Sequence, residues 1–209
     1  MRIKEVVSGL LSVVLIAGGV ALIGSFFLGW SPGSTATNRG DPAGFNVPDL
    51  GPLAEAPEAS GGPEDKTLTV TIPDMARVKD AKVPDAAGDD EEALRNNAAI
   101  HLKGTGFPWQ EEANVYLAGH RLGYPGTESF LAFFDLNELE EGDEVFVTDA
   151  DGRRYTYRVT REFVVDPTDL SVTEPVEGKN VLTLQTCTLP DYSRRLIVRA
   201  ELVDVAQEA

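Results

Sequence analysis

Cysteine, histidine and positive charge are all scarce in this chain. Of 209 residues, one is cysteine and two are histidine, and 18 Lys and Arg are set against 34 Asp and Glu. A single cysteine forms no internal disulfide, so an apolar core must hold the fold. The net charge of −16 repels phosphates, which excludes nucleic acid as an expected partner. No pattern indicates a cofactor.

The acidic residues form clusters, but the clusters lack the pattern of a metal site. Asp149-Ala150-Asp151-Gly152 is an example. A calcium loop places its ligands at alternating positions and ends in a distal glutamate, and this stretch has neither. We interpret it as a hairpin turn and expect no metal.

Charge is absent from one long stretch near the N-terminus. No charged residue occurs from Val6 to Asn38, and the apolar part, 6–30, is long enough to cross a bilayer core of about 30 Å as a helix. Arg2 and Lys4 precede it, so the positive-inside rule places the N-terminus in the cytoplasm. A cleaved signal peptide is the alternative, although its apolar region is usually shorter. We expect residues 1–30 to be a retained single-pass membrane anchor.

The stretch that follows has too few large apolar residues to form a core. Residues 31–65 are rich in Pro, Gly, Ala and acidic residues, which predicts a disordered linker. A domain at 66–209 would then lie outside the membrane. No second apolar segment occurs near the C-terminus, so we expect no second anchor.

The remaining chain alternates apolar and polar residues with the period of β-strands. Short helices are expected only at 91–97 and 135–140, after an exposed acidic loop at 85–92. Many short strands with few helices predict an all-β fold, either a small barrel or a sandwich. The predicted strands cover 67–72, 98–102, 113–118, 144–149, 153–165, 180–186 and 196–203.

The one cysteine stands at the end of a predicted strand. Cys187 follows Leu182-Thr183-Leu184-Gln185-Thr186, His120 follows another strand, and Arg195 opens a third. A lone cysteine with a histidine elsewhere is a candidate nucleophile and base, although an inert buried cysteine gives the same pattern. An arginine would stabilise the oxyanion of an attacked carbonyl. Arg194 is a rival, but strand parity places it with the core-facing residues.

Three separated segments together resemble the signature of the sortase family. They are Asn114-Val115-Tyr116-Leu117-Ala118-Gly119-His120, then Thr183-Leu184-Gln185-Thr186-Cys187, then Arg195-Leu196-Ile197-Val198. The resemblance covers about Thr67 to Val203 and implies a closed eight-stranded β-barrel. It also implies a cysteine transpeptidase in which Cys187, His120 and Arg195 are catalytic. The resemblance puts Arg195 ahead of Arg194, because the family's arginine directly precedes the apolar strand.

The resemblance also implies the reaction and its partners. Sortases cleave a Leu-Pro-x-Thr-Gly or Leu-Ala-x-Thr-Gly sorting signal between Thr and Gly. The acyl group passes through a thioester to an amine of a peptidoglycan precursor, which anchors the surface protein that carried the signal. The expected partners are therefore surface proteins with a C-terminal sorting signal, a peptidoglycan-precursor amine and the membrane.

Further motifs are most similar to the class E branch of the family. They include Gly106-Phe107-Pro108-Trp109-Gln110, His120-Arg121-Leu122-Gly123-Tyr124 and Thr186-Cys187-Thr188-Leu189-Pro190. This resemblance makes Thr186 and Tyr116 substrate-binding candidates, with Tyr116 helping to choose between the two signals. As ordinary strand residues, both also have a packing role to explain them.

Two other functions are compatible with parts of the pattern. An L,D-transpeptidase-like cross-linker also uses cysteine and histidine, but it usually has glycine before the cysteine, where this chain has Thr186. A non-enzymatic anchored adhesion or scaffold domain would retain its function without Cys187.

Overall fold

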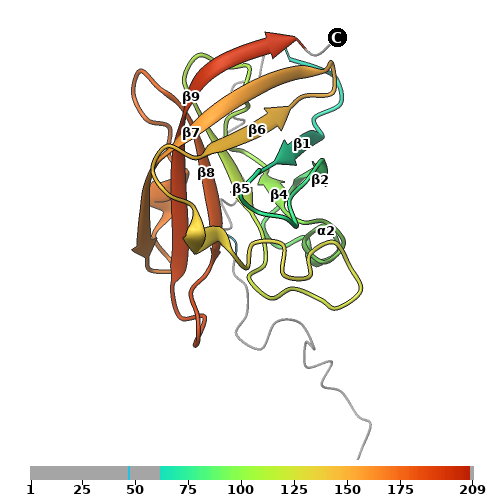
Figure 1. The fold of residues 1–209 in the computed structure, drawn as a ribbon, viewed down its shortest axis with the longest axis vertical. Helices are drawn as coiled ribbons and strands as arrows, with labels where there is room; N and C mark the ends of the chain where they lie inside the picture. The colour runs from blue at the N-terminus through green and yellow to red at the C-terminus, as the bar shows by residue number, and fades with distance from the viewer. Residues whose placement is uncertain (1–46, 48–61, 208–209) are drawn as a thin grey trace, which may run out of the picture. The chain divides into compact units, whose positions relative to one another are not determined.

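A computed structural model describes Val47 and residues 62–207 of the chain. The regular secondary structure of the described part is almost entirely β-strand, with one short α-helix and two single 3₁₀ turns (Figure 1). The elements in chain order are β1 Leu68–Thr71, β2 Ala81–Val83, β3 Asp85–Ala86, α2 Glu91–Asn96, β4 Ile100–Leu102, β5 Ala113–Ala118, η1 Leu136–Glu138, β6 Glu144–Thr148, β7 Arg153–Val165, η2 Leu170–Thr173, β8 Asn180–Cys187 and β9 Arg195–Gln207.

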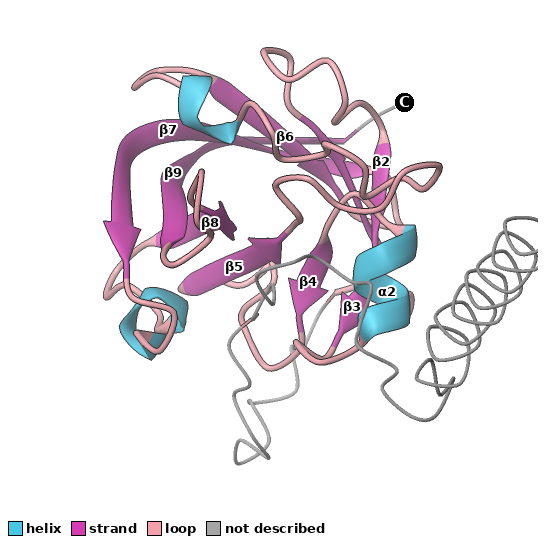
Figure 2. Ribbon diagram, turned by 90° about the horizontal axis from the view of Figure 1, so that it is seen from below, coloured by secondary structure: helices cyan, strands magenta, loops and turns pink. Residues whose placement is uncertain are grey.

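All strands belong to one sheet, and the sheet nearly closes on itself. Its order is β2-β1-β6-β7-β9-β8-β5-β4-β3, and Figure 2 shows the strands following one another round the curve. Only the β5–β8 and β3–β4 pairs are parallel. The seven strands and two helical segments predicted from the sequence are all present, with ends shifted by at most a few residues. The all-β prediction is confirmed as a nearly closed barrel.

The predicted count of eight strands is wrong, because the sheet has nine. The difference arises at Pro84, which has no N–H to donate and therefore interrupts a strand. Before it, β2 pairs with β1, and after it, β3 pairs with β4. The continuous segment 81–86 thus supplies both edge strands of the sheet, β2 and β3. The predicted loop at 85–92 accordingly begins as strand.

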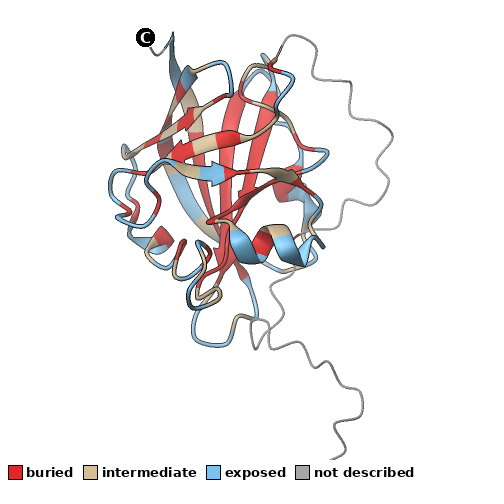
Figure 3. Ribbon diagram, turned by 90° about the vertical axis from the view of Figure 1, so that its right-hand side faces the viewer, coloured by how far each residue is buried: buried red, intermediate tan, exposed pale blue. Residues whose placement is uncertain are grey.

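Side-chain alternation divides the buried residues into two clusters. On β5, Val115 and Leu117 belong to the barrel interior, whereas Tyr116 and Ala118 belong to a second cluster on the outer face. Every residue of β5 and β8 is buried, so both faces of these two strands are covered. Figure 3 shows this burial along the long strands at the centre of the sheet.

The outer cluster includes a residue from the predicted linker. Val47 is 2% exposed and packs with Tyr116, Ala118 and Ile197, among others. The predicted anchor at 1–30 lies outside the described residues, as does the rest of the linker up to residue 61. No helix in the described part of the chain is long and apolar enough to cross a membrane.

An aromatic stack holds the beginning of the domain. The rings of His101, Phe107 and Trp109 stack in sequence, with centroids 4.3 and 4.5 Å apart. Lys66 Nζ lies 4.9 Å from the Trp109 ring centroid, at cation–π distance. A Cβ on Gly62 would come within 2.0 Å of the Trp109 ring. Packing of the domain therefore begins by residue 62, slightly before the predicted boundary at 66.

Candidate active site

Cys187 and Arg195 are direct cross-strand partners. Cys187 ends β8, Arg195 begins β9, and the antiparallel register pairs their Cα atoms. Side chains paired in this way have Cβ atoms about 4.5–5.5 Å apart on the same face of the sheet. Cys187 is 0% exposed and Arg195 is 3% exposed. The register therefore sets a permanent positive charge beside the thiol.

His120 is brought level with Cys187 by the parallel pairing of β5 and β8. The register pairs Ala118 with Gln185, and each functional residue lies two positions further along its strand. Gly119 N donates to Gln185 O at 3.0 Å, which maintains this pairing beyond the end of β5. The sheet thus aligns two residues that are 67 positions apart in the sequence.

The turn that carries His120 requires glycine before it. A Cβ on Gly119 would lie 2.7 Å from Ala98 O and 2.9 Å from a Phe133 ring carbon, closer than real Cβ contacts. Phe133 N also donates to His120 O at 3.2 Å. The His120 ring is 3% exposed and meets Tyr124 edge-on, with centroids 5.4 Å apart. The histidine is therefore fixed by backbone approach on one side and aromatic packing on the other.

The two candidate arginines have different surroundings. Arg195 Nη1 donates to Tyr192 O and to Arg194 O, both at 3.2 Å, so the turn between β8 and β9 holds its guanidinium. Arg194 is half-exposed and lies 3.4 Å from Asp166 in an exposed ion pair. It precedes β9 rather than continuing its core-facing parity, which is why it lies at the surface. Of the two, Arg195 is the arginine on the face of Cys187.

Arg121 is a further cation near the thiol that the sequence did not distinguish. Burial lowers the pKa of Arg121, and this shift is opposed by the carboxylates of Asp135 and Glu162 and by the charge of Cys187. Arg121 Nη2 donates to Asn137 Oδ1, which directs the guanidinium. The sequence motif contains Arg121, but nothing in it separates a buried arginine from a surface one.

The two substrate-binding candidates lie on opposite faces of the sheet. Thr186 is 0% exposed and has the same parity as the interior residues Leu182 and Leu184. Tyr116 is also 0% exposed, but it is on the outer face, where its hydroxyl donates to Gln185 Oε1. Burial raises the pKa of Tyr116, against the opposing effect of the nearby Arg195 charge. The phenol is therefore a neutral hydrogen-bond donor to Gln185.

A buried polar network fastens the β7–β8 loop to side chains of β5, β8 and β9. Asn114 Nδ2 donates to Val172 O at 2.8 Å and to Glu174 O at 2.9 Å. Thr183 Oγ1 donates to Asn114 Oδ1 at 2.7 Å, and Arg199 Nη2 donates to Val172 O at 3.1 Å. Since buried amide and guanidinium groups need such partners, the network fixes the loop that carries η2.

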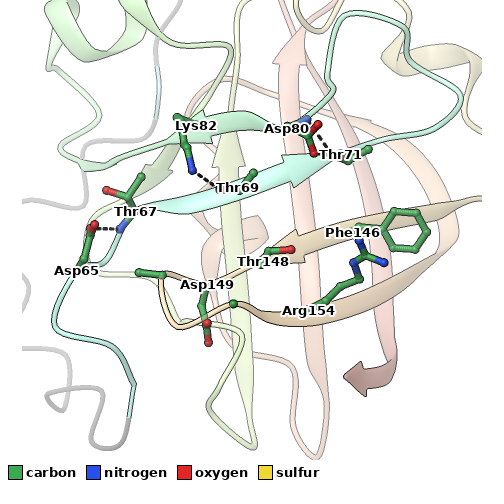
Figure 4. A pocket seen from close by; sticks show the side chains of 12 residues that line it. Asp65, Thr67, Thr69, Thr71, Asp80, Lys82, Phe146, Thr148, Asp149 and Arg154 are labelled. Atoms are coloured by element: carbon green, nitrogen blue, oxygen red, sulfur yellow. Dashed lines mark hydrogen bonds between the residues drawn. The ribbon is translucent and has the colours of Figure 1, made fainter. Parts of the chain in front are cut away.

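A polar groove of about 460 Å³ lies elsewhere, on β1, β2, β6 and the β6–β7 hairpin (Figure 4). None of the three candidate catalytic residues lines it. Several of its polar groups already have hydrogen-bond partners within the protein. Lys82 Nζ donates to Thr69 Oγ1 at 2.8 Å, and the Asp149 carboxylate accepts from Arg153 N at 2.9 Å and from Tyr155 OH at 3.0 Å. We interpret these groups as supports for the sheet and the predicted hairpin turn.

Three side chains on the outer face together have the chemistry of acyl transfer, namely those of Cys187, His120 and Arg195. The thiolate is the nucleophilic form of cysteine, and neighbouring positive charge stabilises it. Cys187 has Arg195 as its cross-strand partner, His120 level with it on β5, and the Arg121 charge within electrostatic reach. An imidazole accepts and donates protons near neutral pH, and a fixed guanidinium stabilises a developing oxyanion.

Comparisons with known proteins identify the family to which the chain belongs. Residues 70–203 match the Sortase domain family. Sortase A of Bacillus anthracis is 29% identical over 168 residues, which is 78% of this chain and 70% of that protein. Sortase A of Streptococcus agalactiae serotype III (strain NEM316) is 39% identical over 90 residues, 43% of this chain and 36% of that protein. The chain thus spans about a third of the length of this relative.

Solved structures give the same result. Sortase C2 of Group B Streptococcus Pilus Island 1 has a TM-score of 0.55 and 34% identity, covering 66% of this chain and 73% of that one. Sortase A from Corynebacterium diphtheriae has a TM-score of 0.56 and 30% identity, covering 66% and 60%. Residues 70–203, which match the family, contain β5, β8, the start of β9 and the residues they align. The chain belongs to the sortase family, a family of cysteine transpeptidases.

Proposed function

We propose that this protein is a membrane-anchored transpeptidase that cleaves a sorting signal of the Leu-Pro-x-Thr-Gly or Leu-Ala-x-Thr-Gly type between Thr and Gly. It transfers the acyl group to a peptidoglycan-precursor amine and so anchors surface proteins to the cell wall. The observation that carries the proposal is the alignment of three side chains on neighbouring strands. Cys187 and Arg195 are cross-strand partners, and His120 is level with them on β5.

The first half of the reaction forms a thioester. The Cys187 thiolate attacks the threonine carbonyl, and the resulting oxyanion is stabilised by the Arg195 guanidinium. As the bond between carbon and nitrogen breaks, protonated His120 gives its proton to the departing glycine amine. The peptide downstream of threonine leaves, and the upstream protein remains attached to sulfur.

The second half regenerates the enzyme. The acceptor amine attacks the thioester carbonyl, and neutral His120 takes the proton that this amine must lose. The carbon–sulfur bond breaks, and Cys187 leaves as a thiolate again beside protonated His120. The new amide links the surface protein to the cell-wall precursor. No cofactor enters either half, since the protein supplies the nucleophile, the acid–base group and the oxyanion donor.

The finer assignments belong to the same proposal. The similar proteins are sortases A and C, and the motifs at 106–110 and 120–124 support class E. Of the two substrate-binding residues implied by the resemblance, Tyr116 lies on the face of Cys187 and remains in the proposal, whereas Thr186 has the parity of the interior residues and does not. We propose that the N-terminus is cytoplasmic, that residues 1–30 form a single-pass anchor, and that the catalytic domain is extracytoplasmic. The uncharged stretch at 6–38, preceded by Arg2 and Lys4, supports this orientation.

Intact-mass spectrometry tests the proposal directly. The full chain in detergent is mixed with a peptide containing either signal, with and without an oligoglycine amine. We expect an adduct of the upstream peptide on the enzyme, which disappears as ligated peptide forms when the amine is present. The Cys187→Ala variant should form no adduct. Failure of the folded wild-type chain to form an adduct or cleave either peptide would contradict the proposal and favour a scaffold role.

A further inference from the structure

Gln185 has a buried polar atom that the described chain leaves without a partner. The residue is 1% exposed, and its Nε2 makes no hydrogen bond within the described residues. It lies two positions before Cys187 on β8. Alternate residues of a strand point to the same side, so both side chains are on the outer face. Leaving an amide N–H buried and unpaired is costly, and native proteins rarely do so without a reason.

The oxygen of the same amide group does have a hydrogen-bond partner. Tyr116 OH donates to Gln185 Oε1, and Tyr116 is itself 0% exposed on the adjacent strand β5. This bond fixes the rotation of the amide and sets Nε2 on the side away from the phenol. The nitrogen is therefore a preorganised donor with two N–H groups.

Thr183, the preceding residue on the same face of β8, has hydrogen-bond partners within the described chain. Thr183 Oγ1 donates to Asn114 Oδ1 at 2.7 Å and lies 3.4 Å from Arg199 Nε. The described chain thus completes the bonding of Thr183 but not that of Gln185. Only four buried side-chain atoms in the described part of the chain lack a partner, and three of them are in Arg121, Gln185 and Thr186. Of these, Arg121 adjoins His120 in the chain and Gln185 shares the outer face with Cys187, where the proposed substrate binds, whereas Thr186 has the parity of the interior residues Leu182 and Leu184.

We propose that Gln185 Nε2 donates a hydrogen bond to the backbone carbonyl of the second residue of the bound sorting signal. This inference rests on the proposed function. Two residues of a strand span about 6.6–6.8 Å, and so do two residues of an extended peptide. In the proposed pose the peptide runs in the same direction as β8, so that when the threonine carbonyl is at Cys187, the carbonyl two residues earlier is level with Gln185. That carbonyl belongs to Pro or Ala in the two signals.

This contact reads the peptide backbone rather than a side chain. It is therefore the same for both signals and does not select between them. Tyr116 becomes a positioning residue, because its hydroxyl is engaged with Gln185 and acts on the substrate through the amide that it orients. A change at Gln185 should alter substrate binding, whereas the chemical step at Cys187 should be nearly unaffected.

The test compares enzyme variants with a peptide altered at one backbone atom. A thioamide replaces the carbonyl of the second signal residue, because sulfur is a weaker hydrogen-bond acceptor than oxygen. For the wild type we expect KM to rise about three- to tenfold with the thioamide, the usual range for one hydrogen bond, and kcat to change less than twofold. Gln185→Met should show a similarly raised KM with both peptides and no difference between them. A thioamide at the following residue, whose carbonyl points the opposite way, is the matched control.

Tyr116→Phe tests the positioning role. It removes the hydroxyl but keeps the ring, so KM should rise less than in Gln185→Met, and the double variant should be no worse than Gln185→Met alone. Circular dichroism confirms that each variant is folded. Peptide binding to the Cys187→Ala background gives a readout independent of turnover and should weaken by the same factor on adding Gln185→Met.

The outcomes separate this inference from the proposed function. Wild-type turnover with an unchanged KM in Gln185→Met, or additive effects of the two substitutions, would overturn the role of Gln185 alone. A wild-type chain that neither binds nor cleaves the peptide would overturn both. If Gln185→Met does not fold, the wild-type thioamide comparison decides, and equal KM values for the two peptides would reject the contact.

Discussion

His101 Nδ1 lies 2.8 Å from Asp85 Oδ1, across the short parallel pair that completes the sheet order. His101 Nε2 lies 2.9 Å from Gly106 O. The two ring nitrogens thus have partners on opposite sides, a carboxylate on β3 and a backbone carbonyl after β4. The two side chains link β3 and β4 at the strand edge created by Pro84.

Removing Asp85 should therefore destabilise the barrel. Asp85→Ala leaves His101, which is 0% exposed, without its side-chain partner at Nδ1, and we expect a loss of about 1–3 kcal/mol in the free energy of unfolding. Urea denaturation monitored by circular dichroism measures this. Asp89→Ala removes the same charge from an exposed turn and should change stability by less than about 0.5 kcal/mol. Equal effects of the two substitutions would contradict a specific His101–Asp85 interaction.

The two adjacent arginines should differ sharply in turnover. Arg195→Ala removes the proposed oxyanion donor, so kcat should fall about 10²–10³-fold. Arg194→Ala breaks only an exposed ion pair with Asp166, which contributes little, and kcat should remain within about twofold. The comparison uses steady-state rates of peptide cleavage, measured on variants whose melting temperatures match that of the wild type. Normal turnover in Arg195→Ala would shift the assignment to Arg194 or Arg121.

Gly119 should not tolerate a side chain. The added methyl of Gly119→Ala would lie 2.7 Å from Ala98 O, so the turn that carries His120 must move. We expect a loss of about 1–3 kcal/mol in stability and a lower kcat, measured by urea denaturation and peptide cleavage. Gly126→Ala is the control, since Gly126 has a φ of +85° but open space around it and should cost only about 1 kcal/mol of backbone strain. A fully active Gly119→Ala enzyme would show that the register of His120 is not fixed in this way.

Buried tyrosines should make the protein sensitive to alkali. Burial, together with the Asp149 carboxylate, raises the pKa of Tyr155 to about 12, and burial raises the pKa of Tyr157 well above its ordinary value. In the unfolded chain these phenols ionise near pH 10. Below pH 10 they remain protonated in both states, and between pH 10 and 12 the unfolded chain loses protons first, so stability falls as pH rises. Urea denaturation from pH 8 to 12 should show this fall, with a smaller slope in Tyr155→Phe; an equal slope would contradict it.

The sequence predicted most of the fold because the longer strands are either alternating, as in β6 and β7, or continuously apolar between turn signals, as in β5. The segment 81–86 was missed since β2 and β3 are only three and two residues long, and Pro84 between them resembles a loop signal. η2 at Leu170–Thr173 was missed for a similar reason. Its position depends on Asn114 and Arg199, which capture the loop from distant strands, and a local pattern does not contain that information.

The residues of the candidate site were also predicted only in part. Cys187, His120 and Arg195 were nominated from motifs and chain order, and the sheet register then placed them on neighbouring strands. Gln185 and Arg121 were within those motifs but received no role. What singles them out is burial combined with unpartnered polar atoms, a property that appears only once the strands have been assembled.

The burial of Val47 limits the reach of any attachment at the N-terminal end of the chain. If the proposed anchor ends at residue 30, a tether free as far as residue 65 would extend at most about 120 Å. Because Val47 packs on the barrel, the free length would be residues 31–46, which reach at most about 55 Å. The proposed anchor would then confine the enzyme to a thin layer above the bilayer, where it would have to meet its substrates.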